Sequence, residues 1–189
     1  IDRLNKEIDD YRHWKENEAM FRIVGAIKRL NRKGVTSINL RLCYLKEANL
    51  EGVNLTGADL TGAILEDADL TGANLMEANL ELANLQRASI FDANLRNANL
   101  TWANLDKAQL WNATLEGANL EMAILFGANL EGANLEGANL EGATLEEANL
   151  QGAGVENDWF QKLEKWRVSG RGEIKDKYII GKNRRLKLI

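Results

Sequence analysis

A large apolar residue returns at every fifth position over most of the chain. From Leu40 to Val155 it fills 24 successive units without an insertion, and only Ile90 and Val155 are not leucine. The residue two positions earlier is mostly small, and it is alanine from Ala58 to Ala153, while the residue between the two is usually Asn or Asp. This period fits neither the 3.6-residue turn of an α-helix nor the simple alternation of a strand.

Each unit combines a short strand with a turn. The small–Asn–Leu triplet alternates between inward and outward positions, and the two polar or glycine residues after it suit a turn. A strand and turn repeated in this way must coil, with leucine and alanine facing the axis. One unit cannot bury its own leucine, so the stacking of coils supplies the core. The pattern therefore predicts an all-β solenoid over residues 36–157.

The open ends of such a solenoid expose strand edges and need covering segments. Residues 18–31 carry apolar side chains at helical spacing, which predicts an amphipathic helix over the first coil, within a helical segment of residues 1–35. A shorter apolar stripe precedes this helix and is formed by Ile1, Leu4, Ile8 and Tyr11. The stripe can pack on its own chain or pair with another helix. We favour its own chain, because fewer than two heptads rarely hold a coiled coil.

Residues 158–189 predict a second covering segment. Asp158 and Gln161 have the spacing of a capping box, which predicts a helix to about Arg167. The side chains expected to cover the last coil are Trp159, Phe160, Leu163 and Trp166. From residue 173 onward, apolar residues on both sides of Gly181-Lys182-Asn183 predict a small β-hairpin.

The repeat resembles that of the pentapeptide-repeat family, whose motif is A(D/N)LXX. The resemblance covers residues 38–157, and the leucine at nearly every centre, often followed by glycine, is similar to cyanobacterial members. It implies a right-handed quadrilateral β-helix with four units in each coil. The repeat region would then form about six coils, between α-helical caps at both ends and a small C-terminal hairpin.

Charge is segregated along the chain. Residues 1–35 carry a net charge of +3, residues 36–157 carry −13 and residues 158–189 carry +6, within a total of −4. No run of about 18 apolar residues exists, so no membrane span is predicted in this chain. The single Cys43 and the lack of a visible signal peptide predict a reducing, cytoplasmic compartment. Because the chain begins with a charged segment and not with Met, it also fits the cytoplasmic part of a larger, membrane-tethered protein.

Residue types that perform catalysis or bind metals are sparse. His13 is the only histidine, and further ligands for a metal site are missing around it. Cys43 falls in an inward slot, where we expect a buried filler and not a nucleophile. Neighbouring carboxylates arise from the outward positions of the repeat, and the chain has no phosphate loop or dinucleotide motif. We therefore expect no enzyme activity, no metal site and no cofactor.

Several outward positions break the polar rule. Stacking by 20 residues places Leu82, Trp102 and Met122 in one ladder, with Ile124 close to Met122. A second pair stacks on the opposite face and consists of Phe91 and Trp111. An exposed apolar patch usually marks a contact site. The alternatives for what covers the ladder are a terminal segment of the same chain, a second copy, or a different protein.

The acidic residues also form columns. Glu116, Glu136 and Glu156 fall in one column, and Glu121 and Glu141 fall in the next. A solvated face is the simplest explanation, while the sharper one is mimicry of the phosphates of DNA, as in family members that protect DNA gyrase from quinolones. This chain departs from those members, because its centres lack phenylalanine, no loop interrupts a coil and its ends are basic.

The sequence therefore predicts a non-catalytic scaffold that binds an unknown protein partner through the ladder of Leu82, Trp102 and Met122. The alternatives are a DNA-mimicking regulator of a topoisomerase such as gyrase, and the cytoplasmic domain of a larger protein. Homo-oligomerisation remains open, and we do not expect direct binding of nucleic acid.

Overall fold

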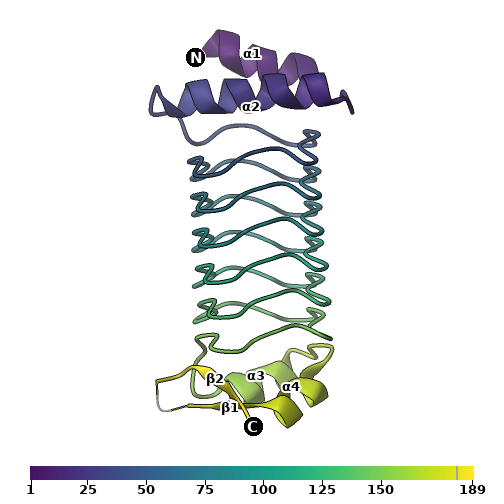
Figure 1. The fold of residues 1–189 in the computed structure, drawn as a ribbon, viewed down its shortest axis with the longest axis vertical. Helices are drawn as coiled ribbons and strands as arrows, with labels where there is room; N and C mark the ends of the chain where they lie inside the picture. The colour runs from purple at the N-terminus through teal and green to yellow at the C-terminus, as the bar shows by residue number, and fades with distance from the viewer. Residues whose placement is uncertain (182) are drawn as a thin grey trace.

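The computed structural model describes residues 1–181 and 183–189. The chain forms a rod in which helices α1 and α2 lie at one end, and α3, α4 and a two-stranded sheet lie at the other (Figure 1). Between the two ends, the backbone winds through stacked coils (Figure 1). The elements are α1 (Asp2–Tyr11), α2 (Asn17–Asn31), α3 (Trp159–Lys165), α4 (Arg171–Lys177), β1 (Tyr178–Ile180) and β2 (Leu186–Leu188).

The coils are joined by parallel bridges between residues 20 positions apart. The bridges run from Asn39 with Asp59 to Asn134 with Gly154. Since a unit has five residues, four units complete each coil and give the solenoid four faces. The outward strand residues of the first face are 39, 59, 79, 99, 119 and 139. Those of the second, third and fourth faces follow at steps of five.

The interior is filled by the two inward positions of every unit. The leucines and alanines from Ala58 to Ala143 are at most 2% exposed, and Cys43 is completely buried among them. The outward Asn between them has a local task as well. The Asn79 Oδ1 accepts a hydrogen bond from the backbone N–H of Glu81 at 3.2 Å, and its neighbour Asn99 donates to the same oxygen at 2.9 Å. Asn therefore pairs a turn N–H while it links adjacent coils.

The second turn residue of each unit from Leu40 to Leu150, here called the turn position, adopts a left-handed backbone. From Leu42 to Gly152 its φ lies between 53° and 74° in all 23 units. Glycine takes this conformation without a steric penalty, and it fills ten of these positions. The remaining positions carry side chains that must bear the cost of the conformation.

The N-terminal end is covered by α2 and held by side-chain hydrogen bonds. The buried face of α2 joins the solenoid core through Met20, Ile23, Val24, Ile27 and Leu30. Most of the N-terminal stripe packs on its own chain: Ile8 of α1 is 1% exposed and belongs to the same core, Leu4 and Tyr11 pack against that core, and Ile1 is exposed. At the open edge of the first coil, the Asn31 amide donates to the carbonyl of Asn54 and accepts from its N–H, both at 2.8 Å. One side chain thereby takes the place of a neighbouring strand.

The C-terminal end resumes the coil after a helical insertion. The helix predicted to reach about Arg167 ends at Lys165, because the next residues pair with the last complete coil. The Gly142 N–H donates to the Trp166 carbonyl at 2.7 Å, and Ser169 forms a parallel bridge with Thr144. The predicted capping box is not formed, since the Asp158 side chain makes no capping bond and instead pairs with Lys162 at 3.4 Å.

The remainder of the chain closes the other half of this end. The structure has helix α4 at residues 171–177, where no helix is predicted, followed by the antiparallel pairing of β1 and β2. The N–H of Gly152 donates to the carbonyl of Leu186 at 2.8 Å, which occupies the edge of the last coil. The predicted turn contains residue 182, which lies outside the described residues.

Candidate protein-contact surface

The predicted ladder of Leu82, Trp102 and Met122 lies at the corner between the first and second faces. Each member occupies a turn position, and their backbones are in consecutive coils: the Leu82 N–H donates to Thr101 and the Trp102 N–H donates to Glu121. Their side chains are 58%, 53% and 37% exposed, in that order. Three large apolar side chains thus stand in one column and face solvent.

The sequence analysis missed a fourth member of this column. Leu42 also occupies a turn position of the same corner and is 53% exposed. The column skips Gly62, but the Leu42 side chain leans over that coil, and its Cδ2 lies 2.8 Å from where a Cβ of residue 62 would be. Met122 covers Gly142 in the same way, with its Sδ in that space. We call Leu42, Leu82, Trp102 and Met122 the apolar ridge.

The backbone conformation at the ridge does not favour large apolar residues. Among the 23 turn positions, the large apolar residues number four, and all four belong to this column. The others hold Gly, Asn or a charged residue. A left-handed backbone costs a residue with a Cβ roughly 1–2 kcal/mol, and such strain is found where surrounding structure or function requires it. The fold alone therefore does not explain why these four residues are apolar.

The second face, next to the ridge, is the least polar of the four. Ile124 is 43% exposed, and its row also contains the half-buried Tyr44 and Ile64. The matching rows of the other three faces hold Asn, Asp, Ser, Thr, Gln and Gly. Ile124 lies beside the ridge as predicted, so the apolar surface extends from the corner onto this face.

The predicted aromatic pair lies at a different corner. The rings of Phe91 and Trp111 are 6.4 Å apart in an edge-to-face arrangement. Phe91 is half-buried and Trp111 is 42% exposed. These residues follow the third face, diagonally opposite the ridge, so the structure does not bring the two apolar groups together.

The first predicted acidic column is largely neutralised by cations. Glu116 pairs with Arg96, and Glu136 pairs with Arg184 from the C-terminal segment. Glu156 lies 3.2 Å from the Nζ of Lys162 and accepts a hydrogen bond from the Gly137 N–H at 2.5 Å. This column is therefore not a free row of carboxylates.

The second acidic column stands directly beside the ridge. It contains the predicted Glu121 and Glu141, and Glu81, which the sequence analysis missed. None of the three takes part in an ion pair within residues 1–181 and 183–189. We call Glu81, Glu121 and Glu141 the acidic rim.

Comparison with known families agrees with this architecture. The family model for pentapeptide repeats matches eight copies over residues 43–81, 83–121 and 123–154, which is more than half of the chain. The chain belongs to the pentapeptide-repeat family. Members of this family form right-handed quadrilateral β-helices and are generally structural or interaction proteins.

Several solved pentapeptide-repeat structures resemble this one. HetL of Nostoc sp. strain PCC 7120, a protein involved in heterocyst differentiation regulation, is 33% identical over 64% of this chain and 76% of its own, with a TM-score of 0.34. Rfr23 of Cyanothece 51142 is 42% identical over 53% of this chain and 61% of its own, with a TM-score of 0.35. A thylakoid-lumen protein of Arabidopsis thaliana is 31% identical over 61% of this chain and 77% of its own, with a TM-score of 0.32. No curated protein matches the chain.

Within the described residues, the single thiol is buried and no cluster of metal ligands is assembled. Burial raises the pKa of the Cys43 thiol to about 11, so it stays protonated and unreactive near neutral pH. Among residues 1–181 and 183–189, no group of three or more His, Cys, Asp or Glu side chains is placed to hold a metal ion. Within the same residues, no helix has the length and apolarity to cross a bilayer.

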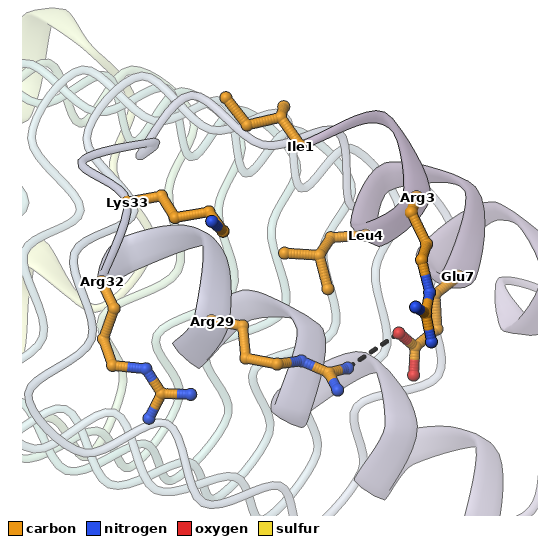
Figure 2. A pocket seen from close by; sticks show the side chains of 7 residues that line it. All are labelled: Ile1, Arg3, Leu4, Glu7, Arg29, Arg32 and Lys33. Atoms are coloured by element: carbon orange, nitrogen blue, oxygen red, sulfur yellow. Dashed lines mark hydrogen bonds and ion pairs between the residues drawn. The ribbon is translucent and has the colours of Figure 1, made fainter.

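A basic hollow lies between α1 and α2 (Figure 2). Its charged lining comprises one carboxylate and four cations, and Arg29 pairs across the gap with Glu7 at 2.8 Å (Figure 2). Arg29 lies in the last turn of α2 and Arg32 and Lys33 follow it, where cations stabilise the carbonyls at a helix C-terminus. The hollow is lined by Ile1, Arg3, Leu4, Glu7, Arg29, Arg32 and Lys33. The helix dipole of α2 favours cations at these positions, so much of the positive charge of the hollow has a structural explanation.

Proposed function

We propose that this pentapeptide-repeat protein is a non-catalytic scaffold that binds another protein through the apolar ridge. The observation that carries the proposal is that every large apolar residue at a turn position, the second turn residue of its unit, lies in one exposed column. Gly or Asn is less strained in that conformation. A selected contact explains why large apolar side chains are kept there.

The shape of the ridge supports this function. Leu82, Trp102 and Met122 lie on consecutive coils whose backbones are joined by hydrogen bonds, so the surface is held rigid before a partner arrives. Rigid apolar surface needs little ordering on binding, and tryptophan is enriched among residues that dominate binding energy. In this proposal the terminal segments cap the coils, and the shaft presents the contact surface.

Neutralisation of the first acidic column weakens the alternative of DNA mimicry. A mimic of phosphates needs a row of unpaired negative charges, whereas Glu116, Glu136 and Glu156 each meet a cation. The first column therefore does not support a topoisomerase regulator. The carboxylates of the acidic rim form no ion pair within residues 1–181 and 183–189, but they lie beside apolar side chains, which fits a protein contact.

The proposal is tested by affinity capture from a lysate of the source organism with three forms of the protein. These are the wild type, Trp102→Asn and Trp111→Gln. Asn already occupies the same backbone position at residues 97 and 112, and Gln occupies the position equivalent to Trp111 at residues 86 and 151. We expect a captured protein to be lost with Trp102→Asn and retained with Trp111→Gln. Capture that is equal in all three forms, with all three folded, would refute the proposal.

A further inference from the structure

The coils that carry Leu82, Trp102 and Met122 bring only negative charge to the ridge, whereas cations stand at its two ends: Arg41 beside Leu42, and Arg167 after Trp166, whose carbonyl pairs with Gly142. The coil segments 79–84, 99–104, 119–124 and 139–144 contain the whole acidic rim and neither lysine nor arginine. Glu81 stands one residue before Leu82, Glu121 one residue before Met122, and Glu141 one residue before Gly142 in the next coil, while Thr101 precedes Trp102. The rim therefore follows this part of the ridge along the rod. A surface that combines apolar side chains with unpaired carboxylates is complementary to one that combines apolar and cationic side chains.

A partner cannot approach the ridge by adding a β-strand. The backbone N–H of Trp102 donates to Glu121 and that of Leu100 donates to Asn119, so each coil is already paired with the next. Inside the turn, the Ala103 N–H donates to the Leu100 carbonyl of the same coil, so it is also occupied. The side of the rod therefore has no open strand edge, and recognition must use side chains.

The spacing of the ridge fits an α-helix that lies along the rod. Stacked strands are about 4.8 Å apart, so Leu82 and Met122 are separated by roughly 9.6 Å along the axis. Seven residues of an α-helix advance about 10.5 Å. Apolar residues at positions i, i+3 or i+4, and i+7 of a helix would therefore meet Leu82, Trp102 and Met122 in turn.

Building on the proposed function, we propose that the ridge binds a basic amphipathic helix of a partner protein. The apolar stripe of that helix packs on the ridge, and lysine or arginine beside the stripe pairs with the acidic rim. A second copy of this chain fits less well, because packing the coils of Leu82, Trp102 and Met122 against the same coils of another copy would bring two acidic rims together, and these coils contribute no lysine or arginine.

The test uses three fluorescent peptides of about 18 residues, long enough to form helix in water. They share an apolar stripe, and the residues beside it are lysine, glutamine or glutamate. Binding is measured by fluorescence anisotropy to the full chain at about 0.05 M and 0.3 M salt, which changes the screening of exposed charges. We expect the lysine peptide to bind about tenfold more tightly than the glutamine peptide at low salt, and the glutamate peptide to bind most weakly.

Two sets of variants locate the effect. We expect the preference for the lysine peptide to be lost in the triple variant Glu81→Gln/Glu121→Gln/Glu141→Gln. Trp102→Asn should weaken the binding of all three peptides. The matched control, Glu51→Gln/Glu77→Gln/Asp92→Asn, removes three charges at other corners and should leave the preference unchanged.

Equal binding of the three peptides, or no binding of the lysine peptide, would overturn the inference. So would a dimer in sedimentation velocity that dissociates with Trp102→Asn, because a second copy would then occupy the ridge. Either result leaves the Trp102-dependent capture of a partner as a separate question, so the inference and the proposed function can fail independently.

Discussion

Leu80 and Leu82 are two residues apart on the same coil, and the fold explains one of them only. Leu80 is completely buried, while Leu82 is 58% exposed in a left-handed turn position. The same contrast returns at Leu100 and Trp102. Apolar residues on the inside are required by the packing of the solenoid. Apolar residues on the ridge are held at a conformational cost, so they need a different explanation.

Another corner shows how the same backbone is occupied without an apolar side chain. Arg87 stands at a turn position between the second and third faces, with φ of 57°. Its guanidinium binds Asp67 at 2.8 Å and Glu66 at 2.6 Å across neighbouring coils. A turn position can therefore carry a charged residue that links coils, which makes the choice at the ridge more distinctive.

The largest contrast is expected between Leu100→Ala and Trp102→Asn. Leu100 is fully buried, so its truncation leaves a cavity and should lower the free energy of unfolding by about 3 kcal/mol. Trp102→Asn loses partial packing but places a residue that tolerates the left-handed backbone, so its cost should stay below about 1 kcal/mol. Urea unfolding of both variants measures the difference. Similar losses in the two variants would erase the distinction between inside and ridge.

The inward slot next to Leu42 offers a test by pH. Burial raises the pKa of Cys43 from 9.0 to about 11, so the folded state favours the neutral thiol. The stability that this provides is complete below pH 9 and is lost as pH rises toward 11, by about 2 kcal/mol. Between pH 8 and pH 11, the free energy of unfolding should therefore fall more steeply for the wild type than for Cys43→Ala. An equal fall in both proteins would show that solvent reaches the Cys43 thiol in the folded state.

The cost of the ridge can be measured by placing a leucine where the chain has glycine. Gly137 has φ of 74°, and the atom nearest to an added Cβ is 3.6 Å away, so space is available. Gly137→Leu should lower the free energy of unfolding by about 1 kcal/mol through backbone strain. Gly137→Asn, which matches Asn97 in the same column, should cost less. An unchanged stability in Gly137→Leu would mean that the ridge carries no strain.

The smallest effect is expected at the polar corner. Hydrogen bonds from Lys46 and Arg87 lower the pKa of Glu66, and a hydrogen bond from Arg87 lowers the pKa of Asp67. This stabilisation is present above the ordinary carboxyl pKa and is lost as pH falls through the lowered values. Arg87→Gln should therefore show a weaker loss of stability between pH 6 and pH 3 than the wild type in urea unfolding. An identical acid profile would show that the pairs are screened by solvent.

The regular features of the molecule follow from the sequence, whereas the pairings at its ends do not. The step of 20 residues is enough to stack Leu82 on Trp102 and Phe91 on Trp111, because every unit has the same length. Leu42 was missed because Gly62 interrupts that step, and only the side-chain direction shows that the gap is covered.

Other features depend on contacts between distant segments. The ion pair of Glu136 with Arg184 joins residues 48 positions apart. Because Arg184 lies outside the repeat, the repeat pattern alone predicts an unpaired column of acidic residues. The segment 166–169 completes a strand of the coil without the repeat motif, since Val168 fills an alanine slot and Gly170 allows a backbone approach that a Cβ would block at 2.7 Å. Local patterns cannot predict such pairings, because the second partner lies outside the repeat.

The unfolding free energy of Leu82→Asn/Trp102→Asn/Met122→Asn tests the central claim most directly, namely that the ridge serves binding and not folding. The backbone strain that is relieved offsets the half-exposed packing that is lost. We therefore predict a triple variant within about 1 kcal/mol of the wild type in urea unfolding, well below the cost of one buried leucine. A loss of about 3 kcal/mol or more would contradict the account, because the ridge would then be part of what holds the solenoid together.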